Sequence, residues 1–144
     1  MDRKWIIGLG ALGALFLFTK GPTLYQQGHL SNASVHVGNK RFWVRVANDN
    51  KSRARGLMGV RTLKPGTGML FTFDKPERHT FWMKNTHIPL HLAFFRRNGT
   101  LDSIHHMRPH DLRGASSRGP VLYALEVNLG ELDNIGSNPR LSLR

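Results

Sequence analysis

Two strand-like segments joined by Asn98-Gly99 constrain the fold of this chain more than any other feature. Residues 90–95 and 101–106 are rich in apolar residues, and Asn-Gly between such segments is the strongest short signal for a β-hairpin. If Asn98-Gly99 forms a two-residue turn, His91 faces His106 on one side of the sheet. Directly opposed side chains have Cβ atoms ~5 Å apart. The sequence therefore predicts an antiparallel hairpin that carries a histidine pair.

The other strand patterns extend this hairpin into a single small sheet. They lie at residues 34–37, 41–46, 68–73, 80–83, 121–127 and 141–143, with turn residues between them. Residues 74–76 are expected to end the strand that begins at 68. The apolar period changes over residues 48–58, after Asn and Asp that can cap a helix, and residues 129–135 predict a second short helix. We expect a mainly β (α+β) domain with one curled or barrel-like antiparallel sheet and two short helices.

The N-terminus predicts a membrane helix that precedes the domain. Residues 5–18 form an apolar run of 14 residues, which would span ~21 Å as a helix. This length is short of the ~30 Å hydrocarbon core of a bilayer. Because no small-x-small cleavage site follows, we interpret residues 1–20 as an uncleaved anchor, residues 21–33 as a linker and residues 34–144 as the domain. A cleaved signal peptide and a buried core helix are the alternatives.

The charge of the chain favours an anionic partner. The formal net charge is +12, and beyond residue 20 there are 18 Lys and Arg against 8 Asp and Glu. Such an excess favours contact with a lipid surface, a nucleic acid or an acidic protein. The chain has no cysteine, which excludes disulfides and thiolate chemistry.

Several segments, in order along the chain, match the pattern of one family. They are Arg-x-Arg-Gly-Leu-Met at 53–58, Gly-Met-Leu-Phe at 68–71, Phe-Trp-Met-Lys-Asn-Thr at 81–86, Ile-Pro-Leu at 88–90 and Leu-Glu-Val at 125–127, followed by Gly130. Across residues 34–143 the chain resembles the domain of unknown function 192 family. The resemblance implies a fold and gives almost nothing about activity. His91 stands where the family pattern usually has Asp.

Lys84, Asn85, His91, Glu126 and Arg55 are the candidate ligand-binding residues. Glu126 lies within an apolar run, so an inward orientation would require a partner such as Lys84 or Arg55. Such a carboxylate can serve as a general base supported by Lys84, or as half of a structural ion pair. The change from Asp to His91 argues for a binding or structural role. The sequence has no triad order or paired-carboxylate spacing, and we expect no enzyme.

Two further sets of residues are candidates for contact with ions. Scattered basic residues can form an anionic contact surface, and they are Arg53, Arg61, Arg108, Arg113 and Arg118. His91 and His106 can share a Zn²⁺ ion, which would need further ligands, for example His79, His87, His110 or Glu126. Ordinary polar histidines explain the pair equally well, and we expect no other cofactor.

These observations favour a membrane-tethered, non-enzymatic structural or interaction module. It would link a membrane to an anionic or protein partner in an envelope or virion-type assembly. The domain would lie on the non-cytoplasmic side or on the internal membrane of a virion. One alternative is a small-ligand or metal-binding domain of the cell envelope. Another is a sequence-independent nucleic-acid binder, which is disfavoured because the sequence has no recognition helix or aromatic RNA-binding motif.

Overall fold

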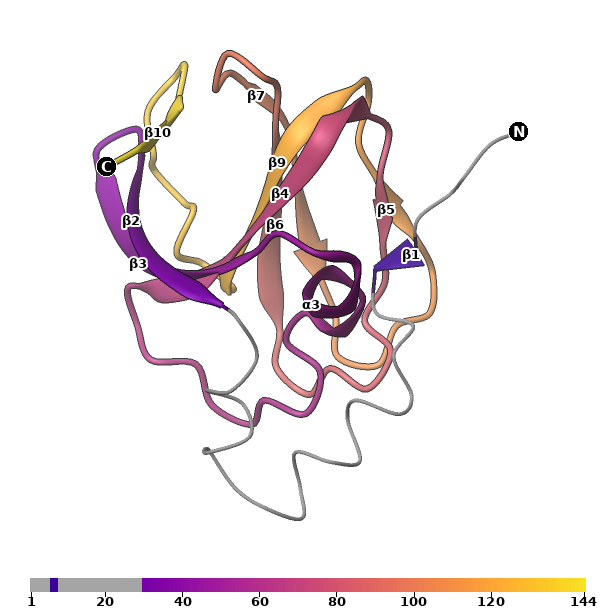
Figure 1. Ribbon diagram of the computed structural model, residues 1–144. Coiled ribbons are helices and arrows are strands. Elements are labelled where there is room, and N and C mark those ends of the chain that lie inside the picture. Colours follow the sequence, from indigo (N-terminus) through magenta and orange to yellow (C-terminus); the bar gives the residue numbers. More distant parts are fainter. Residues whose placement is uncertain (1–5, 8–29) are drawn as a thin grey trace.

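A curled seven-stranded sheet forms the body of the domain (Figure 1). The computed structural model describes residues 6–7 and 30–144. The sheet has the order β10-β2-β3-β4-β9-β6-β7, in which β3 and β4 run parallel and the other neighbours run antiparallel. In chain order its strands are β2 (Ser31–Val37), β3 (Lys40–Ala47), β4 (Thr67–Glu77), β6 (Leu90–Phe95), β7 (Leu101–Met107), β9 (Val121–Asn128) and β10 (Leu141–Leu143).

The two edges of the sheet meet at one point. Thr100 forms an isolated bridge with Arg140, and the amide of Leu141 donates to the carbonyl of Gly99 at 2.8 Å. A Cβ on Gly99 would lie 2.5 Å from the Leu141 oxygen, so this approach requires glycine. The sheet is therefore a half-barrel that is pinned closed at one end.

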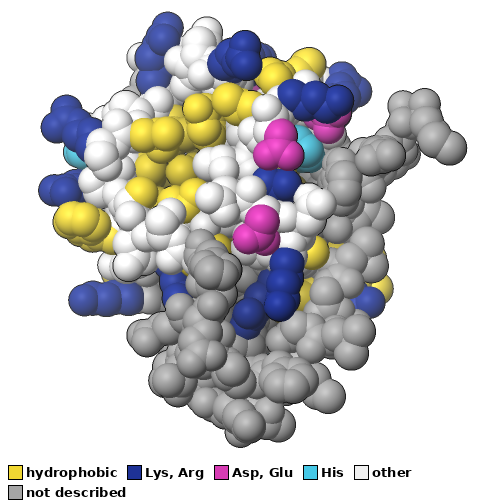
Figure 2. Space-filling model, in the orientation of Figure 1, with side chains coloured by type: hydrophobic (Ala, Val, Ile, Leu, Met, Phe, Trp, Pro, Cys, Tyr) yellow, Lys and Arg dark blue, Asp and Glu magenta, His cyan; other side chains and the backbone are white. Residues whose placement is uncertain are grey.

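Apolar side chains pack on both faces of the sheet. The inner cluster takes residues from both edges of the half-barrel, and it consists of Val35, Val37, Phe42, Val44, Leu70, Ala93, Phe95, Leu125, Val127, Leu132, Ile135 and Leu141. Figure 2 shows apolar side chains in the hollow between β10 and the β4–β9 pair, with Lys and Arg around them. The outer cluster lies on the other face and includes Phe71, Phe81 and Phe94, whose rings meet edge to face.

The helix that the sequence predicts at 48–58 forms over a shorter span, as α3 (Asn50–Arg55). Asp49 caps its start, because the Asp49 carboxylate accepts from the Ser52 amide at 2.7 Å while the Ser52 hydroxyl accepts from the Asp49 amide. Gly56 ends the helix with φ +52°. Leu57 and Met58 are buried just beyond the helix.

The predicted second helix at 129–135 is wrong, and this segment forms consecutive turns. Gly130 has φ +92° and Asn134 has φ +57°, which no α-helix accommodates. The bond from the Glu131 amide to the Asn128 carbonyl is an i to i−3 contact. The expected antiparallel sheet is confirmed in part, because the sheet is curled and mostly antiparallel but β3 and β4 are parallel.

The structure also changes the limits of two predicted strands. Residues 74–76 do not end the strand that begins at 68, since β4 continues to Glu77 with an irregular register after Thr72. Pro76 is tolerated there because its missing N–H falls within that irregularity. The strand predicted at 80–83 is confined to β5 (Thr80–Phe81), which pairs with β8 (Ala115–Ser116).

The hairpin between β6 and β7 is confirmed, but its turn differs from the predicted one. The Gly99 amide donates to Arg96 and the Arg96 amide donates to Thr100, each at 2.9 Å. Gly99 has φ +84°. The connection is therefore a three-residue loop that ends in a left-handed glycine, rather than the two-residue turn expected from Asn98-Gly99.

A shift in the β6–β7 ladder compensates for this longer turn. The register changes between Phe94 and Phe95, and Asp102 is the extra residue on β7. Beyond the shift the predicted pairing is restored, and His91 faces His106 as expected. The bulge therefore positions both the histidine pair and the carboxylate of Asp102.

The predicted anchor at 1–20 and most of the predicted linker lie outside the described residues. Within the anchor the structure describes β1 (Ile6–Ile7), which pairs in parallel with β5. Among residues 6–7 and 30–144, no helix has the length and apolar character that crossing a membrane requires.

Candidate functional site

Two loops are hydrogen-bonded to the segment that carries Lys84 and Asn85. The Gly59 amide donates to the Asn85 carbonyl at 3.0 Å, and Asn85 has φ +53°. On the other side, the His110 amide donates to the Thr86 carbonyl at 3.1 Å. These bonds fix a continuous edge of the domain, which we name the signature rim and define as residues 59–61, 84–87 and 108–113.

The signature rim is rich in cationic and imidazole side chains. Its members of this kind are Arg61, Lys84, His87, Arg108, His110 and Arg113. The Lys84 ammonium lies 5.4 Å from the centre of the Trp82 ring, and His87 Nδ1 lies 3.1 Å from His110 Nε2. Desolvation lowers the pKa of His87, and the charges of Arg61 and His110 lower it further.

Asp111 is the carboxylate of the signature rim, and it is already paired. The Arg113 guanidinium donates to both of its oxygens at 2.7–3.1 Å, and the Arg113 amide donates to Oδ1 at 2.9 Å. These bonds lower the pKa of Asp111 to about 2. The pair keeps Asp111 ionised and fixes the loop around Leu112.

The other predicted basic residues lie apart from the signature rim. Arg53 is a largely buried residue of α3, and it donates to the Thr72 carbonyl at 2.8 Å and to Asn50 at 2.9 Å. The Arg118 amide donates to Asp102 at 2.7 Å. Thus Arg61, Arg108 and Arg113 of the predicted contact surface lie on loops of the signature rim, while Arg53 and Arg118 lie elsewhere in the domain.

Glu126 is a buried carboxyl on β9. It is 5% exposed, and its strand neighbours are Met69 and Leu92. A Cβ on Gly56 would lie 3.9 Å from its Oε2, so the carboxyl lies beneath the end of α3. None of the ion pairs seen among the described residues involves Glu126. Burial raises its pKa to about 8, so it is protonated at neutral pH.

His91 lies on the opposite face of the sheet. Because Leu92 pairs with Glu126 and His91 with Val127, the side chains of His91 and Glu126 point away from each other. The predicted set of Lys84, Asn85, His91, Glu126 and Arg55 therefore does not converge on one ligand.

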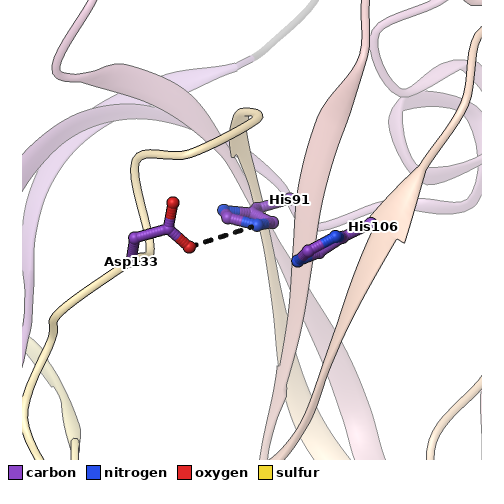
Figure 3. A group of neighbouring side chains, drawn as sticks. All are labelled: His91, His106 and Asp133. Carbon is purple, nitrogen blue, oxygen red and sulfur yellow. Dashed lines mark ion pairs between the residues drawn. The ribbon is translucent and has the colours of Figure 1, made fainter.

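A cluster of His91, His106 and Asp133 contains the predicted histidine pair (Figure 3). The two imidazole rings lie 4.6 Å apart, and His91 Nε2 lies 3.9 Å from the Asp133 carboxylate. One ligand atom from each residue can be chosen so that all three lie within 4.8 Å of one another. The arrangement thus contains the pair of possible metal ligands that the sequence predicts. Asp133 is a further member that sequence reasoning missed.

The hydrogen bonds of His91 oppose metal binding. Its Nδ1 accepts from the amides of Gly130 and Leu132, each at 3.2 Å. A neutral imidazole has one unprotonated nitrogen, so Nε2 carries the proton and has no lone pair for an ion. Metal-binding histidines normally donate from the second nitrogen, which is the reverse of this pattern. Burial and the nearby charge of His106 also lower the pKa of His91 and keep the ring neutral.

Sequence reasoning missed a buried polar network around the β7 bulge. Asp102 accepts from the amides of Arg118 and Gly119 at 2.7 and 3.1 Å and from the Ser103 hydroxyl at 2.9 Å. His105 Nε2 lies 3.1 Å from that hydroxyl. Two consecutive polar residues at 102–103 interrupt the strand alternation, which was the available signal. The network anchors the 117–119 loop to β7.

His79, which the sequence offers as a possible further zinc ligand, is a second buried group. It is 3% exposed and stacks on Phe73 with ring centres 3.5 Å apart. Neither ring nitrogen has a hydrogen-bond partner among the described residues. Burial lowers its pKa to about 4, so the ring is neutral.

A polar cavity of about 400 Å³ adjoins the signature rim. It lies between the end of β7 and the loop that leads to β8. Its lining includes His106, Arg108, Asp111, Arg113 and Ser116. The cavity is open to solvent, and its arginines can accommodate a small anionic group.

Comparisons with known proteins identify the family. Residues 33–142 match the model of the DUF192 family, which is described as uncharacterized ACR, COG1430, and the chain belongs to this family. The resemblance found in the sequence is thereby confirmed. No curated protein matches the chain.

Two solved structures are similar to the chain. A protein from Sinorhizobium meliloti 1021, called a "putative transcription regulator", is 33% identical, with a TM-score of 0.75 over 79% of this chain and 95% of that one. A protein of unknown function from Novosphingobium aromaticivorans DSM 12444 is 29% identical, with a TM-score of 0.69 over 80% of this chain and 84% of that one.

Proposed function

We propose that the protein is a non-enzymatic binding module whose signature rim holds an anionic partner. The N-terminal segment would tether it to a membrane, so that the domain links that membrane to a partner in an envelope or virion-type assembly. The observation that carries the proposal is that Arg61, Lys84 and Arg108 lie on three adjacent loops, of which the 59–61 and 108–113 loops are each hydrogen-bonded to the 84–87 loop.

Two physical features support this function. Backbone hydrogen bonds on both sides of the 84–87 loop fix the loop backbone before a partner arrives, which reduces the backbone entropy lost on binding. Pairing with Arg113 also neutralises Asp111, so this carboxylate opposes an anion less. A non-enzymatic role is further supported because Glu126 and His91 point to opposite faces of the sheet.

Chromatography of the full-length chain on immobilised polyglutamate tests the proposal. The double variant Arg61→Glu/Lys84→Glu should elute at clearly lower salt than the wild type, because two rim cations become repulsive. The matched control is Arg97→Glu/Arg140→Glu, which makes the same change in net charge with exposed arginines at the hairpin end. Equal losses in the two variants would show attraction by net charge alone and would refute a rim-specific site.

Nucleic-acid binding is the second candidate, because one structural relative is called a "putative transcription regulator". Phosphate contacts would make retention on double-stranded DNA fall steeply with salt. Within residues 6–7 and 30–144 the helix is α3, whose six residues are too few for a groove-reading helix and lie against the sheet. Stronger retention on DNA than on polyglutamate at equal salt would favour this candidate over the first.

A further inference from the structure

Leu112 is an exposed apolar side chain at the centre of the basic loop. It is 62% exposed, compared with 58% for Trp43, 51% for Leu143 and 45% for Leu129, the other large apolar residues exposed in the described chain. A single exposed leucine is ordinary on a protein surface. The surroundings of Leu112 distinguish it from the other leucines.

The backbone on both sides of Leu112 is fixed. The Asp111 carbonyl accepts from the Met83 amide at 2.8 Å, and the Asp111 carboxylate accepts from the Arg113 amide at 2.9 Å. The preceding residue, His110, is bonded through its amide to the Thr86 carbonyl. Leu112 therefore cannot turn inward unless these bonds break, and the fold holds it toward solvent.

Basic and aromatic groups surround this apolar tip. Arg108, His110 and Arg113 lie within the same loop and are exposed. Lys84 lies across the signature rim beside the half-buried Trp82 ring. An apolar tip between cations matches the boundary of an anionic bilayer, where acyl chains lie beneath phosphate groups.

We infer that the signature rim docks on an anionic lipid surface, with Leu112 entering the acyl boundary and the surrounding cations contacting lipid phosphates. This inference rests on the proposed function and names the partner of the rim. A lipid is favoured over an acidic protein because the loop presents an apolar side chain between cations, and an anionic bilayer offers acyl chains beneath its phosphates.

A single-cysteine probe tests the inference in the full-length protein. The chain has no cysteine, so Leu112→Cys can be labelled with an environment-sensitive fluorophore at one site. The labelled protein is reconstituted into vesicles of phosphatidylcholine with or without phosphatidylglycerol. We expect a blue shift and a several-fold increase in emission with the anionic lipid, both reversed at high salt.

Two further proteins control the measurement. Leu143→Cys places the same label on an exposed leucine of β10, and its emission should not respond to the anionic lipid. Adding Arg108→Gln to the Leu112→Cys protein should weaken docking about fivefold, because one cation near the surface is lost.

Each other outcome overturns the lipid inference. An unchanged Leu112 probe, or an equal response from the Leu143 probe, would show that the rim does not dock on the bilayer. If rim-specific retention on polyglutamate persists in that case, the proposed function stands with an acidic protein as partner. If that retention also fails, the proposed function fails with it.

Discussion

Glu126 and His91 are buried at neighbouring positions on adjacent strands, yet their surroundings on the two faces of the sheet differ. On the inner face, His91 accepts from the amides of Gly130 and Leu132 and thereby holds the turn that covers the inner cluster. On the outer face, Glu126 has the apolar strand neighbours Met69 and Leu92, and none of the ion pairs of the described residues involves it.

This contrast distinguishes a buried polar group with a structural role from one whose burial has no structural explanation. A buried polar group that satisfies the backbone stabilises the fold, whereas an unpartnered carboxyl remains neutral and lowers stability when it ionises. His91 therefore has a structural explanation that does not need a ligand. Glu126 has none, and a retained destabilising group is typical of functional sites. Each of the four predictions below tests one side of this comparison.

The largest effect is expected from Glu126→Gln. The pKa of Glu126 is raised from 4.5 to about 8, so between these values the folded chain holds a proton that the unfolded chain has released. Wild-type stability therefore falls as the pH rises from 4.5 to 8. Glutamine removes this loss, and at pH 8 the free energy of unfolding should rise by about 4 kcal/mol.

Urea unfolding from pH 5 to pH 8 measures this effect. Glu77→Gln is the matched control, because Glu77 is a partly exposed carboxyl beside Lys75. If Glu126→Gln follows the wild-type pH dependence, the carboxyl of Glu126 is ionised and paired in solution, and the contrast with His91 disappears.

His91→Ala should have the next largest effect. It leaves the amides of Gly130 and Leu132 without an acceptor, and we expect a loss of about 3 kcal/mol. His91→Asp, which restores the residue of the family pattern, supplies carboxylate acceptors and should remain within about 1 kcal/mol of the wild type. Equal losses in the two variants in denaturant unfolding would contradict the acceptor role.

His79 should produce a smaller effect of opposite pH dependence. Its pKa is lowered from 6.5 to about 4. Below pH 6.5 the unfolded chain therefore binds a proton that the folded chain does not bind. Stability is therefore lost as the pH falls, by about 2 kcal/mol at pH 5. In urea unfolding, His79→Leu should reduce this loss of stability at acid pH. The variant His110→Gln, at an exposed site, should leave the loss unchanged.

The smallest effect is expected at His106. This residue is exposed, and His106→Ala should change the free energy of unfolding by less than about 0.5 kcal/mol. Because the Nε2 of His91 carries a proton, added Zn²⁺ should not raise the Tm of the wild type. A Zn²⁺-dependent rise in Tm that His106→Ala abolishes would instead establish a metal site.

The strand pattern was predictable because alternation is local. It located β6, β7 and β9 to within a residue or two, and the hairpin register came out correctly because the Asp102 bulge offset a longer turn. The turn at 129–135 was missed because its apolar spacing is helical, while the left-handed Gly130 cannot be read from that spacing.

The candidate site was predictable only in part. Lys84 and Asn85 were selected from their motif, but their proximity to residues 108–111 depends on long-range bonds such as that from Met83 to Asp111. Likewise, placing His91 and Glu126 on opposite faces requires the β6–β9 register, which no local pattern contains.

The closure of the half-barrel has a consequence for synthesis of the chain. Strand β10, which pairs with β2, and Arg140, which bridges to Thr100, are synthesised after every other strand of the described sheet. Until they emerge, the β2 edge and the Gly99 loop have no partner on that side. A nascent chain therefore exposes an open strand edge that favours pairing with other chains. Synthesis of residues 140–143 covers this edge and thereby ends its exposure to other chains.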